Sequence, residues 1–356
     1  CNTSGNSVGG LYGIASSSGS VGLFGTKNTS TGNWVCQNNI FGGSIANSMQ
    51  TTSTATSTIV IGIQNTGRNS TITGNTVRNF STGGGNAGTY AASAMGILVN
   101  PGSATHTVTG NTIHSISSTN TTQANILSGI LVNGTSTGNV ISGNLISNIT
   151  ASSPVATVNG IQIANGISTY SNNMISLGSG VNQGCTIHGI YETGGSNNVY
   201  HNSVLLNGNP TANSGYSYSF RSTQFGNIRN FVNNIFFNSR SNSGSTGKHY
   251  AISIAGISQC YSNNNLLFAD GTGGILGLLN SSEKTTLAEW QSATGLDSNS
   301  VTGNPNYISD SDLHIDTSQS SPVGNAGRNI ASVTDDIDGD IRSLNTPDIG
   351  ADEFNS

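Results

Sequence analysis

One short phrase, an Asn followed two residues later by an aliphatic residue, returns eight times along the chain. Successive copies are separated by 37, 36, 33, 29, 29, 31 and 31 residues. This self-similarity is typical of stacked structural repeats and restricts the fold to a solenoid. The Asn residues of the phrase are Asn38, Asn75, Asn111, Asn144, Asn173, Asn202, Asn233 and Asn264.

A second phrase, a small residue followed by a large apolar one, precedes every Asn except the first by 13 to 15 residues. Aliphatic residues alternate around it, as in Ile161-Gln162-Ile163, which predicts short strands. Each coil is therefore expected to contain strand, connection, strand, bend and strand. The phrase reads Gly62-Ile63, Gly96-Ile97, Gly129-Ile130, Gly160-Ile161, Gly189-Ile190, and then the weaker Ser219-Phe220 and Ala251-Ile252.

Stacking explains how such short coils become stable. A single coil cannot bury its inward aliphatic side chains, whereas coils stacked at about 4.8 Å align equivalent side chains in columns. Stacked Asn amides can each donate to one neighbour and accept from the other. We predict an all-β fold, a right-handed parallel β-helix of about eight coils over residues 1–269. Its predicted structural ladder is Asn75, Asn111, Asn144, Asn173, Asn202, Asn233 and Asn264.

The character of the chain changes over residues 270–356, which we interpret as a cap and an acidic closing segment. The stretch "SSEKTTLAEWQSATG" has Ser and Thr before an apolar-periodic run and Gly after it. This pattern predicts one short capped helix at about residues 285–293, ended by Gly295. The cap is expected to cover the last coil, whose exposed strand edges would otherwise invite aggregation.

The coils, over about residues 10–269, resemble the pectin-lyase-like superfamily of secreted parallel β-helices. The later "DIDGDIR" and "PDIGADEF" resemble closing segments of large secreted β-helix proteins of the Bacteroidota, with the likeness covering about residues 283–354. Such proteins often continue into a fibronectin-like module or a type IX secretion sorting domain. The resemblance implies a secreted or cell-surface protein that is part of a larger multidomain chain or surface assembly. It transfers no catalytic residue.

Charge is divided sharply along the chain. Residues 1–269 carry a net charge of +6 with Glu192 as their only acid, and residues 270–356 carry −11. Glycoside hydrolases usually need two carboxylates beside the scissile bond, and calcium-dependent lyases need several to hold the ion. The coils cannot supply either set. Seven basic residues spread over 269 positions also make no dense patch for nucleic acid.

Residues able to act on or bind a carbohydrate gather in coils six and seven. A metal-independent polysaccharide lyase would need a neutral base and an Arg that stabilises developing charge, and its catalytic candidates are His188, His201, Tyr200 and Arg221. A sugar-binding strip would use aromatic rings and a carboxylate-gripping Arg, and its candidates are Tyr191, Glu192, Tyr218 and Arg229. His188 precedes its Gly whereas His201 precedes its Asn, so the two imidazoles are expected on different faces. Ordinary surface decoration is the remaining interpretation.

The absence of paired acids and the small polar surface favour a non-catalytic, rigid structural or adhesive module that contacts polysaccharide or surface glycan. The alternative is the metal-independent lyase or a related carbohydrate-active enzyme. Ice binding is a minor alternative, because "TITGN" and "TVTGN" place Thr-x-Thr in register on only two coils. No apolar run approaches the roughly 20 residues of a membrane span.

The acidic turn of Asp336, Asp338 and Asp340 partly resembles a calcium loop but lacks its spacing and distal Glu. Structural calcium is one expectation, with Asp335, Asp348, Asp352 or Glu353 completing the cage, and solvated turn carboxylates are the other. No cofactor is required. The four cysteines have no CxxC spacing, so buried thiols are expected rather than a zinc site, with a disulfide as the alternative. Cys1 is interpreted as a fragment end or a lipid-modified terminus.

Overall fold

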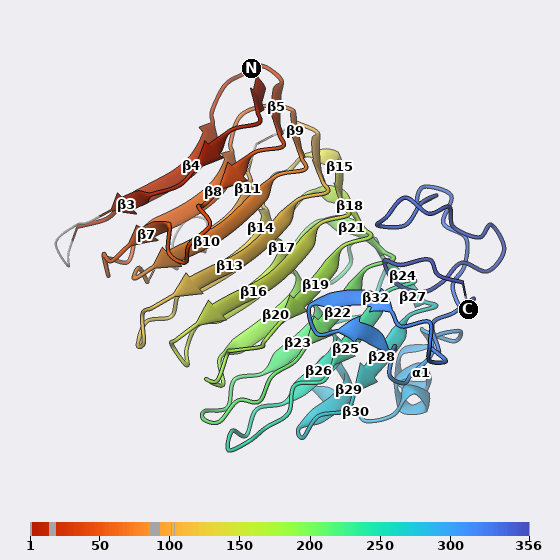
Figure 1. The fold of residues 1–356 in the computed structure, drawn as a ribbon. Coiled ribbons are helices and arrows are strands. Elements are labelled where there is room, and N and C mark those ends of the chain that lie inside the picture. Colours follow the sequence, from red (N-terminus) through yellow and green to blue (C-terminus); the bar gives the residue numbers. More distant parts are fainter. Residues whose placement is uncertain (1, 14–18, 86–92, 101, 103, 356) are drawn as a thin grey trace.

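Three long parallel sheets run along the molecule and form a β-solenoid of about eight turns (Figure 1). The computed structural model describes residues 2–13, 19–85, 93–100, 102 and 104–355. We call the three sheets A, B and C, and their strands are given below. Each full turn passes through one strand of each sheet, in the order C, A, B. The predicted all-β parallel solenoid with one short helix near the C-terminus is confirmed.

Sheet A holds the second strand of each turn. In spatial order its strands are β1 (Asn2–Ser4), β5 (Trp34–Gln37), β9 (Ser70–Thr73), β12 (His106–Thr109), β15 (Thr137–Ser142), β18 (Ile167–Ser171), β21 (Ser196–Tyr200), β24 (Arg229–Val232) and β27 (Cys260–Asn263).

Sheet B follows the bend after sheet A. Its main path is β2 (Ser7–Val8), β6 (Ile40–Phe41), β10 (Thr76–Thr82), β13 (Thr112–Ser118), β16 (Leu145–Ala151), β19 (Met174–Leu177), β22 (Ser203–Leu206), β25 (Ile235–Asn238) and β28 (Leu266–Ala269), and β3 (Leu11–Gly13) and β7 (Met49–Thr51) pair beside its first strands.

Sheet C carries the Gly-Ile phrase and extends past the predicted boundary at residue 269. Its strands are β4 (Gly22–Asn28), β8 (Ile59–Asn65), β11 (Ala94–Val99), β14 (Ile126–Val132), β17 (Thr157–Ile163), β20 (Thr186–Glu192), β23 (Ser217–Ser222), β26 (His249–Ile254), β29 (Gly274–Leu279) and the antiparallel β30 (Ser282–Lys284).

The core is a set of aliphatic columns between the three sheets. Register pairs Ile113 with Ile146, and Ile146 with Ile175, along sheet B. The Gly of the second phrase faces these columns at close range. A Cβ on Gly160 would lie 2.5 Å from Ile175 Cγ2 and 2.6 Å from the carbonyl oxygen of Gly189. Gly is therefore required there because sheets B and C approach each other closely.

A continuous row of Asn amides, buried except at its first member, marks the bend between sheets A and B. Asn111 Nδ2 donates to Asn144 Oδ1 at 2.9 Å, and Asn144 Nδ2 donates to Asn173 Oδ1 at 2.9 Å. These bonds satisfy polar groups that would otherwise be unpaired inside the turn. The row consists of Asn6, Asn39, Asn75, Asn111, Asn144, Asn173, Asn202, Asn234 and Asn265.

The predicted ladder positions Asn233 and Asn264 are wrong by one residue, and the first copy of the phrase, at Asn38, also precedes the row residue by one. The row uses the following residue in each of these turns, whereas Asn233 and Asn264 hold left-handed backbone with φ of 60° and 53°. In the last turns the phrase can be read at either of two neighbouring Asn residues, because both faces of the strand that follows are buried and carry apolar side chains. Ile235 packs outward against the closing segment while Phe236 fills the solenoid core.

The position before each row Asn is left-handed in every turn, with Gly in several early turns. Gly reaches this region freely, and Asn tolerates it. Later turns carry side chains there, and these hold the closing segment. Asn172 Nδ2 donates to the Asp335 carbonyl at 2.8 Å, and Asn233 Nδ2 donates to the Arg328 carbonyl at 2.7 Å. The loss of Gly in these turns therefore marks a docking surface for the chain itself.

The cap contains helix α1 (Leu287–Thr294), close to its predicted place. Thr286 and Glu289 form a capping box, and Gly295 ends the helix in left-handed conformation. Trp290 is fully buried and lies over Gly277 of β29. The helix thus covers the last strands of sheet C.

The closing segment folds back along the later turns (Figure 1). Its hairpin of β31 (Tyr307–Ser309) and β32 (Asp312–Ile315) packs near β19 and β22. A second apolar cluster joins the segment to the outer face of sheet B through Met174, Leu205, Ile235, Phe237, Leu266, Leu313, Ile315, Val323, Ile349 and Ala351. No helix among the described residues is long and apolar enough to cross a membrane.

Three cysteines fall within the described residues, and all three are free thiols. Cys36 and Cys185 are buried, as expected for structural thiols, and Cys260 is half-buried. Burial raises the pKa of the Cys36 thiol to about 12, which makes it unreactive at neutral pH. Cys1 lies outside the described residues.

Candidate ligand-binding strip on sheet C

The outer face of sheet C carries two columns of side chains. Ile187 and Ile190 enter the core, so His188 and Tyr191 on the same strand face outward. The residue before the small residue of each turn forms the first column, which includes Asn159, His188, Tyr218 and Tyr250 in register. The residue after the large apolar one forms the second, which includes Gln162, Tyr191, Arg221 and Ser253.

Aromatic rings stack along these columns, and we call His188, Tyr191, Tyr218, Arg221 and Tyr250 the ring strip. The His188 ring stacks on Tyr191 with centroids 4.2 Å apart and on Tyr218 with centroids 5.3 Å apart. Tyr218 and Tyr250 stack at 5.2 Å. Parallel strands place equivalent side chains about one strand spacing apart, which suits ring stacking.

Arg221 is the only cation of the ring strip. Its guanidinium carbon lies 4.6 Å from the Tyr218 ring centroid and 5.5 Å from that of Tyr191. Arg221 forms no ion pair with a carboxylate among the described residues. A half-exposed guanidinium held by ring faces, with donors still free, can bind a carboxylate in bidentate fashion.

The hydrogen bonds of His188 fix its proton on Nδ1. Nδ1 lies 2.9 Å from Asn159 Oδ1, which only accepts, and Nε2 lies 3.4 Å from Arg221 Nη1, which only donates. Burial, and next the charge of Arg221, holds the pKa of His188 well below its usual range. The imidazole is neutral and its free lone pair faces Arg221. With 2% of its surface exposed, His188 positions Arg221 rather than meeting a substrate.

The Tyr218 and Tyr250 phenols of the ring strip remain protonated at neutral pH. Burial raises the pKa of Tyr218, an effect that the charge of Arg221 partly offsets. Burial also raises the pKa of Tyr250, whose hydroxyl donates to Glu283 Oε1 at 2.9 Å. A protonated phenol can donate to a sugar hydroxyl but cannot act as a base.

Glu192 and Arg229, predicted as ligand contacts, are both buried inside the turn. Glu192 accepts from Asn197 Nδ2 at 2.9 Å and from the Ser222 hydroxyl. Burial raises its pKa to about 7, against the opposing effects of Ser222, Asn197 and Arg229. Arg229 donates to the carbonyls of two neighbouring loops, including Gly256 at 2.9 Å. A ligand at the surface does not reach either side chain, and both stabilise the fold.

His201 and Tyr200 lie away from the ring strip. His201 is the left-handed residue of its bend, is fully buried, and has Nε2 2.7 Å from Asn233 Nδ2. It borders a small cavity lined by the closing segment, including Ile330 and Val333. Burial, and next Arg342, holds its pKa well below the usual range. Tyr200 is on sheet A, where its hydroxyl donates to Asn198 Oδ1 at 3.1 Å. The two imidazoles occupy different faces, as expected.

The acidic turn is organised by Asp336. One of its carboxylate oxygens accepts the backbone N–H groups of Asp338 and Asp340 at 2.9 and 2.8 Å, and the other accepts that of Glu353 at 2.9 Å. Arg342 Nη1 pairs with Glu353 Oε2 at 3.1 Å. The "DIDGDIR" and "PDIGADEF" stretches thus form one hydrogen-bonded unit. Asp336 uses both oxygens within the protein, and calcium at Asp336, Asp338 and Asp340 stays a prediction.

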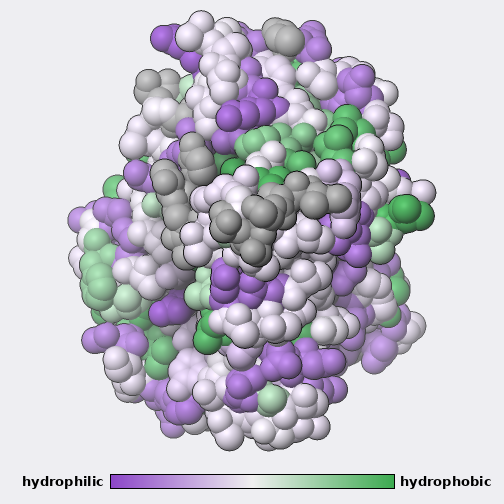
Figure 2. Space-filling view, turned by 90° about the vertical axis from the view of Figure 1, so that its left-hand side faces the viewer, coloured by the Kyte–Doolittle hydropathy of each residue, from purple (hydrophilic) through white to green (hydrophobic). Residues whose placement is uncertain are grey.

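The Thr pairs on sheet A are in register, with Thr73 and Thr109 hydroxyl oxygens 3.0 Å apart. The next strand continues them with Val140 and Ser142. Figure 2 shows one face of the molecule, on which hydrophilic residues and residues of intermediate hydropathy surround separate apolar patches. A flat Thr array is confined to two turns.

Sequence reasoning missed Asn159, Gln162 and Tyr250, and it also missed Glu283 beside them. The signal was present, because the ring-strip columns lie at constant offsets from the Gly-Ile phrase. Counting those offsets along every turn would have placed Asn159 beside His188 and Tyr250 beside Tyr218. Glu283 lies on the antiparallel β30, outside the repeat, and no periodicity predicts it.

The geometry defines a parallel β-solenoid with a cation held among stacked rings on one sheet. Comparison with known proteins adds no family: no protein-family model, curated protein or solved structure matches the chain.

Proposed function

We propose that this chain is a secreted or cell-surface β-solenoid that serves as a rigid, non-catalytic adhesive module and binds acidic polysaccharide at the ring strip. The observation that carries the proposal is Arg221, a half-exposed cation packed against Tyr191 and Tyr218 without a carboxylate partner among the described residues. A uronate residue offers the two chemistries this arrangement recognises. Its carboxylate matches the guanidinium, and its ring can stack on a tyrosine face.

Charge supports an anionic ligand. The only acid in residues 1–269 is Glu192, which is buried, so the ring strip faces no surface carboxylate from the preceding turns. Glu283 lies at the far end of the strip, and it is paired with Lys248 and Tyr250. A polyanion therefore meets little repulsion along the strands before Glu283.

The binding proposal is favoured over the lyase because the strip lacks an accessible base. The lone pair of His188 faces Arg221, and the phenol of Tyr218 is kept protonated. His201 and Tyr200, the other catalytic candidates, lie on other parts of the surface or beneath the closing segment. Removal of the proton beside a uronate needs a base within hydrogen-bond reach.

We also propose the finer family assignment, to the pectin-lyase-like superfamily and to the large secreted β-helix proteins of the Bacteroidota that use type IX secretion. Its support is the parallel solenoid and the "DIDGDIR" and "PDIGADEF" stretches, which pack as one unit against the later turns.

Isothermal titration with polygalacturonate and with neutral dextran tests the function. Wild type is expected to bind the uronate polymer and to ignore the dextran. Arg221→Ala should weaken binding about tenfold to a hundredfold, the loss expected for hydrogen bonds to a charged group. Arg68→Ala is the matched control, since Arg68 is an exposed cation away from the rings. Equal losses in both variants, or binding of dextran as tight as polygalacturonate, would overturn the proposal.

A further inference from the structure

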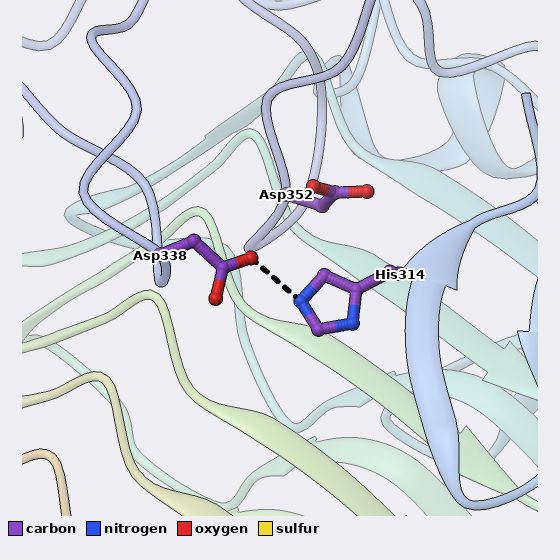
Figure 3. Close-up of side chains that lie close together, drawn as sticks. All are labelled: His314, Asp338 and Asp352. Carbon is purple, nitrogen blue, oxygen red and sulfur yellow. Dashed lines mark ion pairs between the residues drawn. The ribbon is translucent and has the colours of Figure 1, made fainter.

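Three segments of the cap bring potential metal ligands together. His314 lies on β32, Asp338 lies in the acidic turn, and Asp352 lies near the C-terminus. One ligand atom from each residue falls within 4.8 Å of the others. Figure 3 shows the imidazole and the Asp338 carboxylate facing each other, with Asp352 beside them. The spacing is short enough for all three atoms to contact a single ion.

The His314 ring is oriented by a carboxylate on its far side. Asp312 accepts from Nδ1, so Nε2 is the nitrogen that points toward Asp338 and Asp352. Metal-binding histidines commonly have this arrangement, in which the second nitrogen donates to a carboxylate that fixes the ring.

His314 Nε2 is shielded from solvent and makes no hydrogen bond of acceptable angle within the described part of the chain. Asp338 Oδ2 lies only 2.8 Å away, so the two atoms are close without being aligned as donor and acceptor. A nitrogen held between carboxylates needs a positive charge in that space, supplied by a proton on His314 or by a bound cation.

The two carboxylates are also held in place. Asp352 Oδ2 accepts the Ile315 backbone N–H at 2.8 Å, which leaves its other oxygen available. Asp336 accepts the backbone N–H of Asp338 and so fixes the turn that carries it. Supporting contacts of this kind orient metal ligands before the ion binds.

We propose that His314, Asp338 and Asp352 bind a divalent transition-metal ion of the zinc or manganese class. One imidazole nitrogen and two carboxylate oxygens suit such an ion, with water completing the coordination. Calcium prefers six to eight oxygen ligands and gains little from an imidazole. A groove lined by residues that include Met174, Ser311 and Leu313 borders His314. The ion would link β32, the acidic turn and the C-terminal stretch.

The test uses the whole chain, stripped with EDTA and then freed of chelator. Equilibrium dialysis against zinc, manganese or calcium chloride, followed by elemental analysis, measures the bound metal, and a melting curve measures its effect on stability. We expect a single zinc or manganese ion and a higher melting temperature. Asp312→Asn, which contacts the far ring nitrogen and the backbone N–H of His314 and lies outside the proposed ligand set, should weaken binding about 10- to 100-fold.

The controls separate a metal from a proton and from general surface charge. Asp340→Asn removes a neighbouring exposed carboxylate that lies outside the cluster and should leave zinc binding unchanged. His314→Gln should abolish it. If wild type binds no more zinc or manganese than His314→Gln does, the positive charge is a proton on His314 and the proposal fails. Tighter binding of calcium that survives His314→Gln also overturns it.

Discussion

Replacing Asn144 with Leu is expected to destabilise the folded chain by about 3 to 7 kcal/mol. Asn144 is fully buried in the middle of the amide row. Its Oδ1 accepts the backbone N–H and the Nδ2 of Asn111 at 3.1 and 2.9 Å, and its Nδ2 donates to Asn173 Oδ1 at 2.9 Å and to the Val108 carbonyl at 3.0 Å. Leu removes these four bonds, and a longer one from Nδ2 to the Ser142 carbonyl at 3.2 Å, without removing the groups that made them.

The magnitude follows from those groups. The Asn111 backbone N–H has only Asn144 as partner, and burying it unpaired costs about 1 to 3 kcal/mol. The other three of the four shorter bonds contribute about 0.5 to 1.5 kcal/mol each. Asn6→Leu is the matched control, because Asn6 is an exposed end of the row that bonds to Asn39 and Ser4. Its expected cost is below about 1 kcal/mol.

Urea unfolding monitored by circular dichroism compares the two variants with wild type. The midpoint should fall much further for Asn144→Leu than for Asn6→Leu. Equal shifts would refute the idea that amides in the middle of the row carry more stability than its ends.

Three further changes test other parts of the fold. Asn233→Gly suits the left-handed backbone but removes both side-chain bonds to Arg328, so hydrogen exchange in the closing segment should rise. Gly143→Asn, at the same position of an earlier turn, is the control and should leave this exchange unchanged. Equal exchange in the two variants would contradict the role of Asn233 in docking the closing segment. Burial raises the pKa of Glu192 from 4.5 to about 7, so the unfolded chain loses this proton at lower pH than the folded chain does. The free energy of unfolding should therefore fall by about 3 kcal/mol as the pH rises between those values. Urea titrations of Glu192→Gln across the same pH range should lack this fall. Thr286→Ala breaks the capping box of helix α1 and should lower the free energy of unfolding by about 0.5 to 2 kcal/mol. An unchanged melting temperature would show that this capping box does not stabilise the chain.

The solenoid could be predicted because its coils repeat the same physical requirements at a nearly constant interval. Aliphatic side chains must point inward in each turn, and Gly160 and its equivalents must be small where sheets B and C approach. These requirements recur from coil to coil, so the same residue pattern is repeated along the sequence and each copy supports the same strand assignment. The short helix was predictable for a different reason, since Thr286, Glu289 and Gly295 are local signals at its two ends.

The ladder register could not be fully predicted, because the closing segment changes the pattern of the turns it covers. Residues on the outer face of sheet B, such as Ile235, are apolar where the closing segment covers them, so their sequence pattern cannot be distinguished from that of core-facing residues. The same contact explains why Asn172, His201 and Asn233 replace Gly in the bend. Only the folded chain shows that residues about a hundred positions apart share this surface.

The candidate sites were predictable only in part. His188, Tyr191, Tyr218 and Arg221 converge because each lies at a fixed offset in adjacent turns. Glu192 is next to Tyr191 in sequence but points inward, since neighbouring residues of a strand face opposite sides. His314 and Asp352 come from segments without any repeat, and their proximity depends on how the closing segment folds.

The most direct measurement of function is to incubate the whole chain with polygalacturonate and follow polymer binding and ultraviolet absorbance of unsaturated products in the same sample. A non-catalytic ring strip predicts saturable binding, lost in Arg221→Ala, with no product above the rate of the polymer alone. Sustained product formation that disappears in His188→Ala would contradict the proposal and identify a lyase.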